Sequence, residues 1–190
     1  MNTEKADLVI VHASQLLTLA GPPGPRRGAA LGELRLVEDG ALVAQDGLVV
    51  WVGPTADLPD WSARRVLDAR GRVVMPGFVD AHTHLVWAGD RADEFEMRLQ
   101  GATYLEIMAA GGGIMRTVRA TRAASPEQLE AESFLRLREM LAHGTTTAEA
   151  KTGYGLTTED ECKQLRVIQT LGQAQPVELV PTFLGAHLVP

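Results

Sequence analysis

From about residue 76 onward, strand patterns alternate with helix patterns along the chain. Strands are predicted for three stretches, FVDAHTH (78–84), TTTAEAK (145–151) and VELVPTFLGAH (177–187). Helices are predicted between them, at about 126–143 and from Thr158 onward. This order implies a parallel sheet with right-handed crossovers. Because a closed α/β barrel needs about eight strands, the pattern predicts either a small open α/β sheet or the first part of a barrel.

Capping signals mark the ends of the two predicted helices. Ser125 and Gln128 are spaced as a capping box at the start of the first helix, and Gly144 is suited to end it. Thr158 and Glu161 are spaced as a second capping box. The stretch between the strand at 78–84 and the first of these helices is predicted to be irregular.

The N-terminal part, residues 1 to about 75, carries short apolar runs and turn signals. The Asp46-Gly47 pair predicts a β-hairpin, and Ala69-Arg70-Gly71 predicts a second turn of the same kind. We therefore expect an N-terminal β unit at 1–75 and an α/β unit at 76–190.

Composition narrows the function classes. The chain has 190 residues, a formal net charge of −6 and 45% hydrophobic residues, a balance typical of a globular protein. It shows no basic footprint for nucleic acid, no apolar run long enough to span a bilayer, and no signal-peptide pattern at its start. A cytoplasmic protein is the default expectation. Cys162 is the single cysteine, so no internal disulfide can form, and it is interpreted as a small core residue.

The strand at 78–84 contains three polar residues at alternate positions, Asp80, His82 and His84. Alternate side chains of a strand point to one face, and positions two apart lie about 7 Å apart. Two imidazoles at that spacing can converge on one divalent metal ion, such as zinc or iron. Asp80 could orient one of these ligands. Core or surface histidines are the alternative interpretation.

The stretch MPGFVDAHTHL (75–85) resembles the first barrel strand of the amidohydrolase superfamily. Three later stretches, GDRADEFEMRLQGATYLEIMAAGGGI (89–114), EAKTGYGL (149–156) and FLGAHLVP (183–190), are similar to the imidazolonepropionase family within it. The resemblance implies a metal-dependent (β/α)₈ TIM-like barrel preceded by a small β-sandwich segment. It also implies hydrolysis of the ring amide of 4-imidazolone-5-propanoate to N-formimidoyl-L-glutamate.

The resemblance also implies site residues. His82 and His84 match the metal ligands, and Arg91, Tyr154 and His187 match substrate-binding positions. A guanidinium can hold the substrate's propionate through two parallel hydrogen bonds. Tyr104 is a weaker match to the same carboxylate clamp. The alternatives are a solvated surface arginine, an aromatic side chain packed in a turn, and a core tyrosine.

Other reactive residues receive structural interpretations. Gly111-Gly112-Gly113 lacks the Gly-Lys-Ser/Thr ending of a phosphate loop. Lys151 does not match the carboxylated lysine that bridges two metals in other amidohydrolases, so a mononuclear site is implied. His12 falls in the β unit, and His143 falls in the last turn of a helix, where a histidine is favoured by the helix dipole.

The chain departs from the family in one respect. The family's third histidine ligand and its aspartate come from later barrel strands, so no certain catalytic residue is assigned here, and the 190 residues alone are expected to be inactive. The full-length enzyme is expected to be a homodimer with a small-molecule substrate and one divalent metal ion. Two alternatives stay open: a stand-alone non-catalytic metal-binding module, and another amidohydrolase such as a deaminase.

Overall fold

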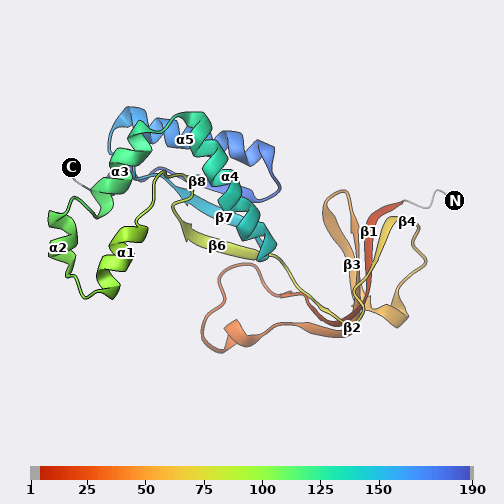
Figure 1. Ribbon diagram of the computed structural model, residues 1–190. Coiled ribbons are helices and arrows are strands. Elements are labelled where there is room, and N and C mark those ends of the chain that lie inside the picture. Colours follow the sequence, from red (N-terminus) through yellow and green to blue (C-terminus); the bar gives the residue numbers. More distant parts are fainter. Residues whose placement is uncertain (1–4, 189–190) are drawn as a thin grey trace. The chain divides into compact units, whose positions relative to one another are not determined.

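The computed structural model describes residues 5–188 of the chain. The chain forms two compact units, and the boundary between them lies between Pro76 and Gly77 (Figure 1). Each unit has its own sheet, so they are described one after the other.

The first unit is a single five-stranded sheet with the strand order β3-β2-β1-β4, in which β5 also pairs with β1. The long strand β1 merges two apolar runs of the sequence. The elements of this unit are β1 (Ala6–Leu17), η1 (Gly28–Gly32), β2 (Leu36–Gln45), β3 (Leu48–Pro54), η2 (Thr55–Asp57), β4 (Ala63–Asp68) and β5 (Val73–Val74).

The two predicted turns of this unit have different outcomes. The hairpin at Asp46-Gly47 is confirmed: β2 and β3 pair antiparallel, and both turn residues have positive φ, as a type I′ turn requires. The turn at Ala69-Arg70-Gly71 also forms, but the predicted hairpin is wrong. Both β4 and β5 pair in parallel with β1. After the turn, the chain continues along β1 and pairs with a later part of that strand.

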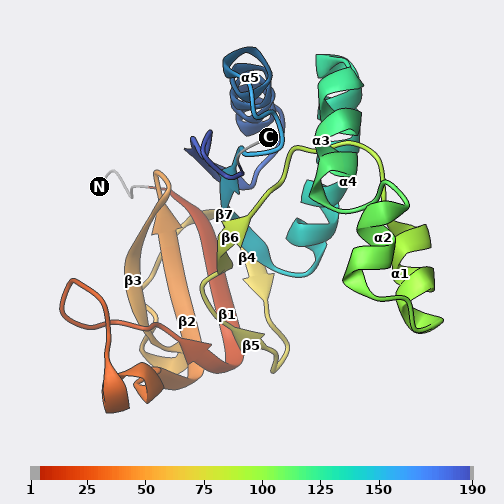
Figure 2. The same cartoon turned by 90° about the vertical axis from the view of Figure 1, so that its left-hand side faces the viewer.

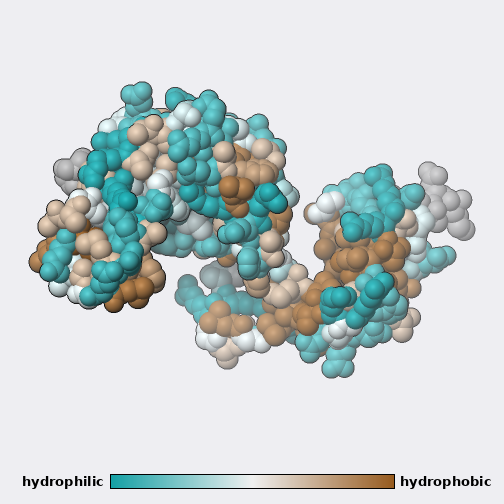
Figure 3. All heavy atoms as spheres, in the orientation of Figure 1, coloured by the Kyte–Doolittle hydropathy of each residue, from teal (hydrophilic) through white to brown (hydrophobic). Residues whose placement is uncertain are grey.

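One face of this sheet is apolar and uncovered within the described residues. Apolar side chains of β1, β2, β3 and β5 line a hollow of about 390 Å³. Figure 3 shows brown, apolar atoms over the strands of this unit. Val49 and Val52, which line this hollow, are 61% and 37% exposed. The described part of the unit is thus one sheet layer, and the β-sandwich stays a prediction.

The second unit alternates strands and helices around a parallel sheet with the strand order β6-β7-β8. This confirms the α/β pattern read from the sequence. The elements of the unit are β6 (Phe78–Thr83), α1 (Ala92–Leu99), α2 (Tyr104–Ala109), α3 (Ile114–Ala123), α4 (Pro126–Ala142), β7 (Thr145–Lys151), α5 (Thr158–Ala174) and β8 (Glu178–Thr182).

The stretch predicted to be irregular instead contains α1, α2 and α3, so that prediction is wrong. These helices have 8, 6 and 10 residues, which is too short to show a clear hydrophobic period. Local signals nevertheless exist. Thr103 and Glu106 form a complete capping box at the start of α2.

The ends of α4 agree closely with the prediction. The Ser125 side chain accepts a hydrogen bond from the backbone N–H of Gln128, but the Gln128 side chain donates to Glu132, so the box is only half formed. Gly144 follows the helix with φ of 94°. The His143 ring bonds the Glu139 carbonyl at 2.8 Å, which supports its structural interpretation.

Helix α5 begins one residue differently from the prediction. Thr157, rather than Thr158, is the N-cap, and it accepts from the backbone N–H of Asp160. The predicted capping box with Glu161 is therefore wrong. Cys162, interpreted from the sequence as a small core residue, is only partly buried. The residues buried on α5 are Glu161, Gln164, Val167, Ile168 and Leu171.

The core of the second unit lies between α4 and α5 and one face of the sheet (Figures 1 and 2). Leu129 and Leu137 of α4 are almost fully buried there, as are Ile168 and Leu171 of α5. Strand β6 differs from the buried strand that its sequence suggests. Residues 78–82 are exposed, because within this unit β6 pairs only with β7, on one side.

Within residues 5–188, no helix has both the length and the apolarity to cross a membrane.

We expect Leu137→Ala to destabilise the second unit by about 2–5 kcal/mol, because it removes a side chain that is 1% exposed and leaves a cavity. Leu135→Ala is the matched control, since Leu135 of the same helix is 59% exposed, and it should change stability by about 0.5 kcal/mol or less. Urea denaturation followed by circular dichroism measures both. Equal losses of stability would contradict this account of the core.

Candidate active site

The ends of the three parallel strands bring three aromatic rings together. His84 follows β6, Tyr154 follows β7 and His187 follows β8. The His84 ring centroid lies 4.7 Å from that of His187 and 4.9 Å from that of Tyr154, and the last two lie 5.6 Å apart. Carboxyl ends of neighbouring parallel strands form the ligand-binding edge of α/β sheets. This three-ring cluster is therefore the centre of the candidate site.

His84 has the properties of a metal ligand. Its Nδ1 atom is buried and has no hydrogen-bond partner within the described residues. Burial lowers the pKa of His84, and the repulsion that a protonated His84 would feel from His187 and Lys151 lowers it further. Both causes favour the neutral ring, whose free lone pair is what a metal ion binds. A buried polar atom without a partner is costly in the absence of a ligand.

His82 and Asp80 are placed differently from what strict alternation predicts. The register of β6 against β7 shifts between Asp80 and Thr83, so the simple two-residue period does not run through this strand. The Asp80 carboxylate accepts from the backbone N–H of His82 at 3.1 Å, and so holds the main chain of that ligand candidate. His82 itself is exposed.

The donor set of the described residues is incomplete for a catalytic metal. No group of three or more His, Cys, Asp or Glu side chains gathers among residues 5–188 in a way that could hold an ion. A catalytic zinc normally has three protein ligands and one open position. The two imidazoles of His82 and His84 fit part of such a set.

The loop after β7 brings Tyr154 to the cluster and also contacts His187. The Nδ1 atom of His187 lies 2.9 Å from the Gly153 carbonyl oxygen. Gly153 has φ of 119°, and a Cβ atom there would lie 2.8 Å from the same Nδ1 atom. Only glycine combines this backbone conformation with so close an approach of the imidazole.

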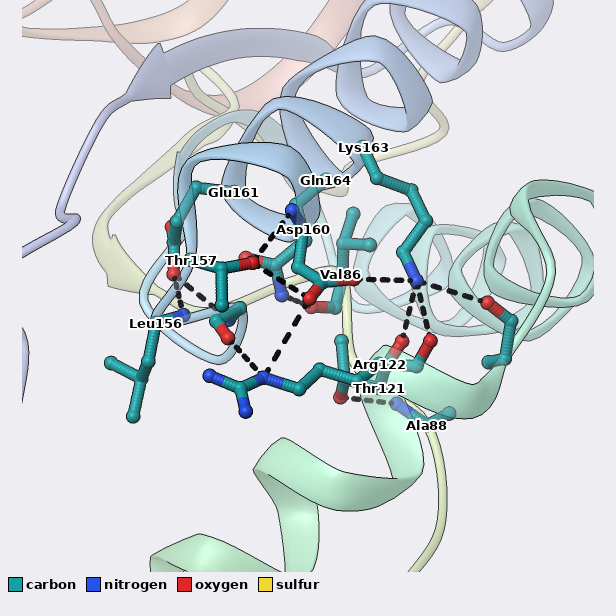
Figure 4. A network of polar contacts seen from close by, with 12 residues as sticks. Val86, Ala88, Thr121, Arg122, Leu156, Thr157, Asp160, Glu161, Lys163 and Gln164 are labelled. Carbon is teal, nitrogen blue, oxygen red and sulfur yellow. Dashed lines mark hydrogen bonds and ion pairs between the residues drawn. The ribbon is translucent and has the colours of Figure 1, made fainter. Parts of the chain in front are cut away.

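Buried polar contacts hold that loop against α5 (Figure 4). The Glu161 carboxylate accepts hydrogen bonds of 2.8 Å from the backbone N–H groups of Gly153, Gly155 and Leu156. Arg122 donates to the Gly155 carbonyl at 2.6 Å. The loop therefore has partners for both its donors and its acceptors.

Arg91 lies just before α1 and is partly engaged. Its guanidinium forms an ion pair of 2.7 Å with Glu94, which is 3% exposed and also accepts from the Gly113 N–H at 2.9 Å. The hydrogen bond that Arg91 donates to Glu94 raises the pKa of Arg91, and the negative charge of Glu94 raises it further. The Arg91 side chain stays 37% exposed.

Tyr104 is the least confined of the sequence candidates. It is the first residue of α2 and is 59% exposed, so it is not the core tyrosine of the alternative interpretation. It forms none of the ring contacts found among the described aromatic residues, which involve only the three-ring cluster.

Lys151 is buried beside the cluster, where it forms an ion pair of 3.1 Å with Glu149. The Glu149 carboxylate also accepts from the Thr182 hydroxyl at 2.9 Å, and these two partners, Thr182 first, lower the pKa of Glu149. The lysine therefore acts as a structural neighbour within this sheet. His12 lies in the first unit, where its ring contacts Asp68.

Two buried glutamates were missed in the sequence. Glu94 supports Arg91, and Glu161 supports the loop that carries Tyr154. Each carried a weak signal: Glu94 is spaced three residues from Arg91, and Glu161 interrupts the apolar side of a helix. Neither signal reveals burial, because burial depends on chain segments far away in the sequence.

Comparison with known proteins gives a consistent result. Residues 65–127 match the Amidohydrolase family. The chain is 57% identical over 188 residues to an imidazolonepropionase of Chloroflexus aggregans. The alignment covers 98% of this chain and 44% of that protein. It is 53% identical over 191 residues to an imidazolonepropionase of Symbiobacterium thermophilum. That alignment covers 97% of this chain and 44% of that protein. These relatives confirm the resemblance read from the sequence motifs.

The chain spans less than half the length of the curated relatives it matches. Among solved structures, it is similar to a variant of atrazine chlorohydrolase from Arthrobacter aurescens complexed with zinc and atraton. That match has a TM-score of 0.60 and 19% identity, and covers 92% of this chain and 35% of that one. At this identity the likeness concerns the fold alone, a mixed α/β fold.

We expect Gly153→Ala to destabilise the second unit by about 1–3 kcal/mol and to displace His187, because the new Cβ meets its ring and the backbone conformation becomes strained. Gly172→Ala is the control, since a Cβ there meets nothing within 4 Å on helix α5, and it should stabilise by about 0.5–1 kcal/mol. Thermal denaturation compares the two variants. A Gly153→Ala variant as stable as its parent would contradict this packing.

Proposed function

We propose that this chain is the N-terminal part of an imidazolonepropionase, an enzyme that hydrolyses the cyclic amide of 4-imidazolone-5-propanoate to N-formimidoyl-L-glutamate. The observation that carries the proposal is the identity of 50–57% to curated proteins of this name along 94–98% of the chain. The activity is proposed for a protein of the relatives' full length. Residues 1–190 alone are expected to be inactive, because the described residues gather too few metal ligands.

The finer architecture belongs to the same proposal. The sheet β6-β7-β8 with its crossover helices would form the first part of a (β/α)₈ barrel, and residues 1–75 would form part of a β-sandwich. The parallel strand order supports the barrel. The uncovered apolar face of the first sheet supports a second layer, because such faces are normally buried.

His82 and His84 would hold one divalent metal ion, zinc or iron. A bound ion would lower the pKa of a water molecule and polarise the substrate carbonyl. The buried Nδ1 atom of His84, which has no partner among the described residues, and the lowered pKa of this ring support the assignment. The similar atrazine chlorohydrolase is described with zinc.

The substrate would lie between the three-ring cluster and Arg91. Tyr154 and His187 offer a phenol and an imidazole to the polar ring of the substrate, next to His84. The Arg91 guanidinium would bind the propionate, with Tyr104 as an additional hydrogen-bond donor. The buried Glu94 holds one side of Arg91, and the exposed remainder of the side chain is available to a second carboxylate.

The two alternative functions are less well supported. A stand-alone metal-binding module agrees with the incomplete donor set but does not explain the arrangement of Tyr154, His187 and Arg91. Another amidohydrolase, such as a deaminase, would share the paired histidines but not the high identity to imidazolonepropionases. The family resemblance also suggests a homodimer at full length, and a cytoplasmic location stays the default expectation from the sequence.

We expect Arg91→Ala to raise the KM for 4-imidazolone-5-propanoate by about 10- to 150-fold, which corresponds to about 1.5–3 kcal/mol for a lost charge-assisted contact. His82→Ala should abolish turnover and lower the bound metal content, because it removes a ligand. The exposed Arg138 of α4 provides the control variant Arg138→Ala, which should leave both the KM and the turnover unchanged. The assay follows imidazolone consumption by the full-length protein.

Absence of imidazolone turnover in the metal-loaded parent protein would refute the proposed function. An Arg91→Ala variant with an unchanged KM would refute the role of that residue.

A further inference from the structure

The loop between β7 and α5, residues 152–157, adopts a conformation that its own sequence disfavours. Leu156 has φ of 55°, in the left-handed region that costs a non-glycine residue about 1–2 kcal/mol. Gly155 is so close to α5 that a Cβ atom would lie 2.5 Å from the Glu161 backbone nitrogen. Such a loop keeps one conformation only when contacts from outside the loop hold it.

The Glu161 carboxylate supplies those contacts. It is 1% exposed, and its two oxygens accept three backbone N–H groups of the loop, one on Oε2 from Gly153 and two on Oε1 from Gly155 and Leu156. A buried carboxylate needs compensating donors, and those it has come from the loop's backbone. Figure 4 shows the carboxylate directed into the turn of the loop.

The same loop determines the hydrogen bonding of His187. The Gly153 carbonyl lies 2.9 Å from His187 Nδ1, and a carbonyl oxygen can only accept, so Nδ1 carries the proton. In the neutral imidazole, Nε2 is then the lone-pair atom. The N–H of the same residue, Gly153, donates to the Glu161 carboxylate at 2.8 Å and, over a longer distance of 3.3 Å, to the Gln164 side-chain oxygen. The carboxylate is therefore the nearer of the two acceptors that hold the residue whose carbonyl selects this tautomer.

We propose that Glu161 is a positioning residue of this site: its buried carboxylate fixes the 152–157 loop, and through Gly153 it fixes the tautomer of His187. The carboxylate lies outside the three-ring cluster and acts on it through the backbone. The catalytic consequence rests on the proposed function, in which Tyr154 and His187 contact the substrate. The structural consequence, a single His187 tautomer, does not depend on any substrate.

Glu161→Gln tests the proposal with almost no change in side-chain volume. The glutamine amide keeps one acceptor oxygen and places an NH₂ donor where the other oxygen was. It therefore faces one of the two sets of backbone N–H donors with a donor, and at least one loop contact is lost. We expect kcat/KM of the full-length, metal-loaded protein to fall at least tenfold. We also expect the His187 signal to move from the Nδ1–H tautomer to a mixture, as seen by ¹⁵N NMR of labelled histidine. A His187→Gln spectrum assigns that signal.

Glu159→Gln is the matched control. Glu159 lies in the same first turn of α5 but is exposed, so its variant should keep the parent tautomer and the parent kcat/KM. All assays run well below each variant's melting temperature. A lower melting temperature with an unchanged tautomer and unchanged kcat/KM would make Glu161 merely structural and would overturn the proposal.

Glu161→Asp keeps the test decisive if Glu161→Gln does not fold. The shorter aspartate retains the charge but cannot reach all three N–H groups, so it should give a mixed tautomer and a smaller loss of kcat/KM. A folded Glu161→Asp variant with the parent tautomer and kcat/KM would also overturn the proposal. Failure of the proposed function is distinguishable, since a parent protein without imidazolone turnover still gives the NMR spectrum that tests Glu161.

Discussion

The site depends on the parallel pairing of β7 with a strand on each of its sides. Ala148 of β7 is in register with Asp80 of β6 and with Leu179 of β8, so all three strands run in one direction. Their carboxyl ends therefore meet at one edge of the sheet. The three rings of the cluster come from the residues that follow these strands. Loops and crossover helices separate the rings by 33 to 103 positions along the chain.

A second constraint is the set of polar contacts that holds the 152–157 loop, which carries Tyr154. Apolar packing gives the core under α4 and α5, whereas the loop is held by the Glu161 carboxylate and by Arg122. Hydrogen bonds have preferred directions, so a satisfied buried network specifies one backbone conformation more sharply than apolar contact does. That specification is what the proposed contact of Tyr154 with a substrate requires.

Much of the second unit could be predicted, because its signals are local. The strand at 145–151, the cap at Ser125 and the end of α4 at Gly144 each depend on a few neighbouring residues. What failed depends on distant partners. The strands around Ala69-Arg70-Gly71 pair with β1 rather than with each other, and Glu161 binds a loop instead of completing a capping box.

The most direct test of the central claim is anomalous diffraction from zinc-loaded crystals of the full-length protein. The account predicts a zinc peak at the carboxyl end of β6, about 2.0–2.1 Å from a ring nitrogen of both His82 and His84. It also predicts that the three-ring cluster lies beside this peak. Zinc bound elsewhere, with both of these imidazoles free of metal, would contradict the account.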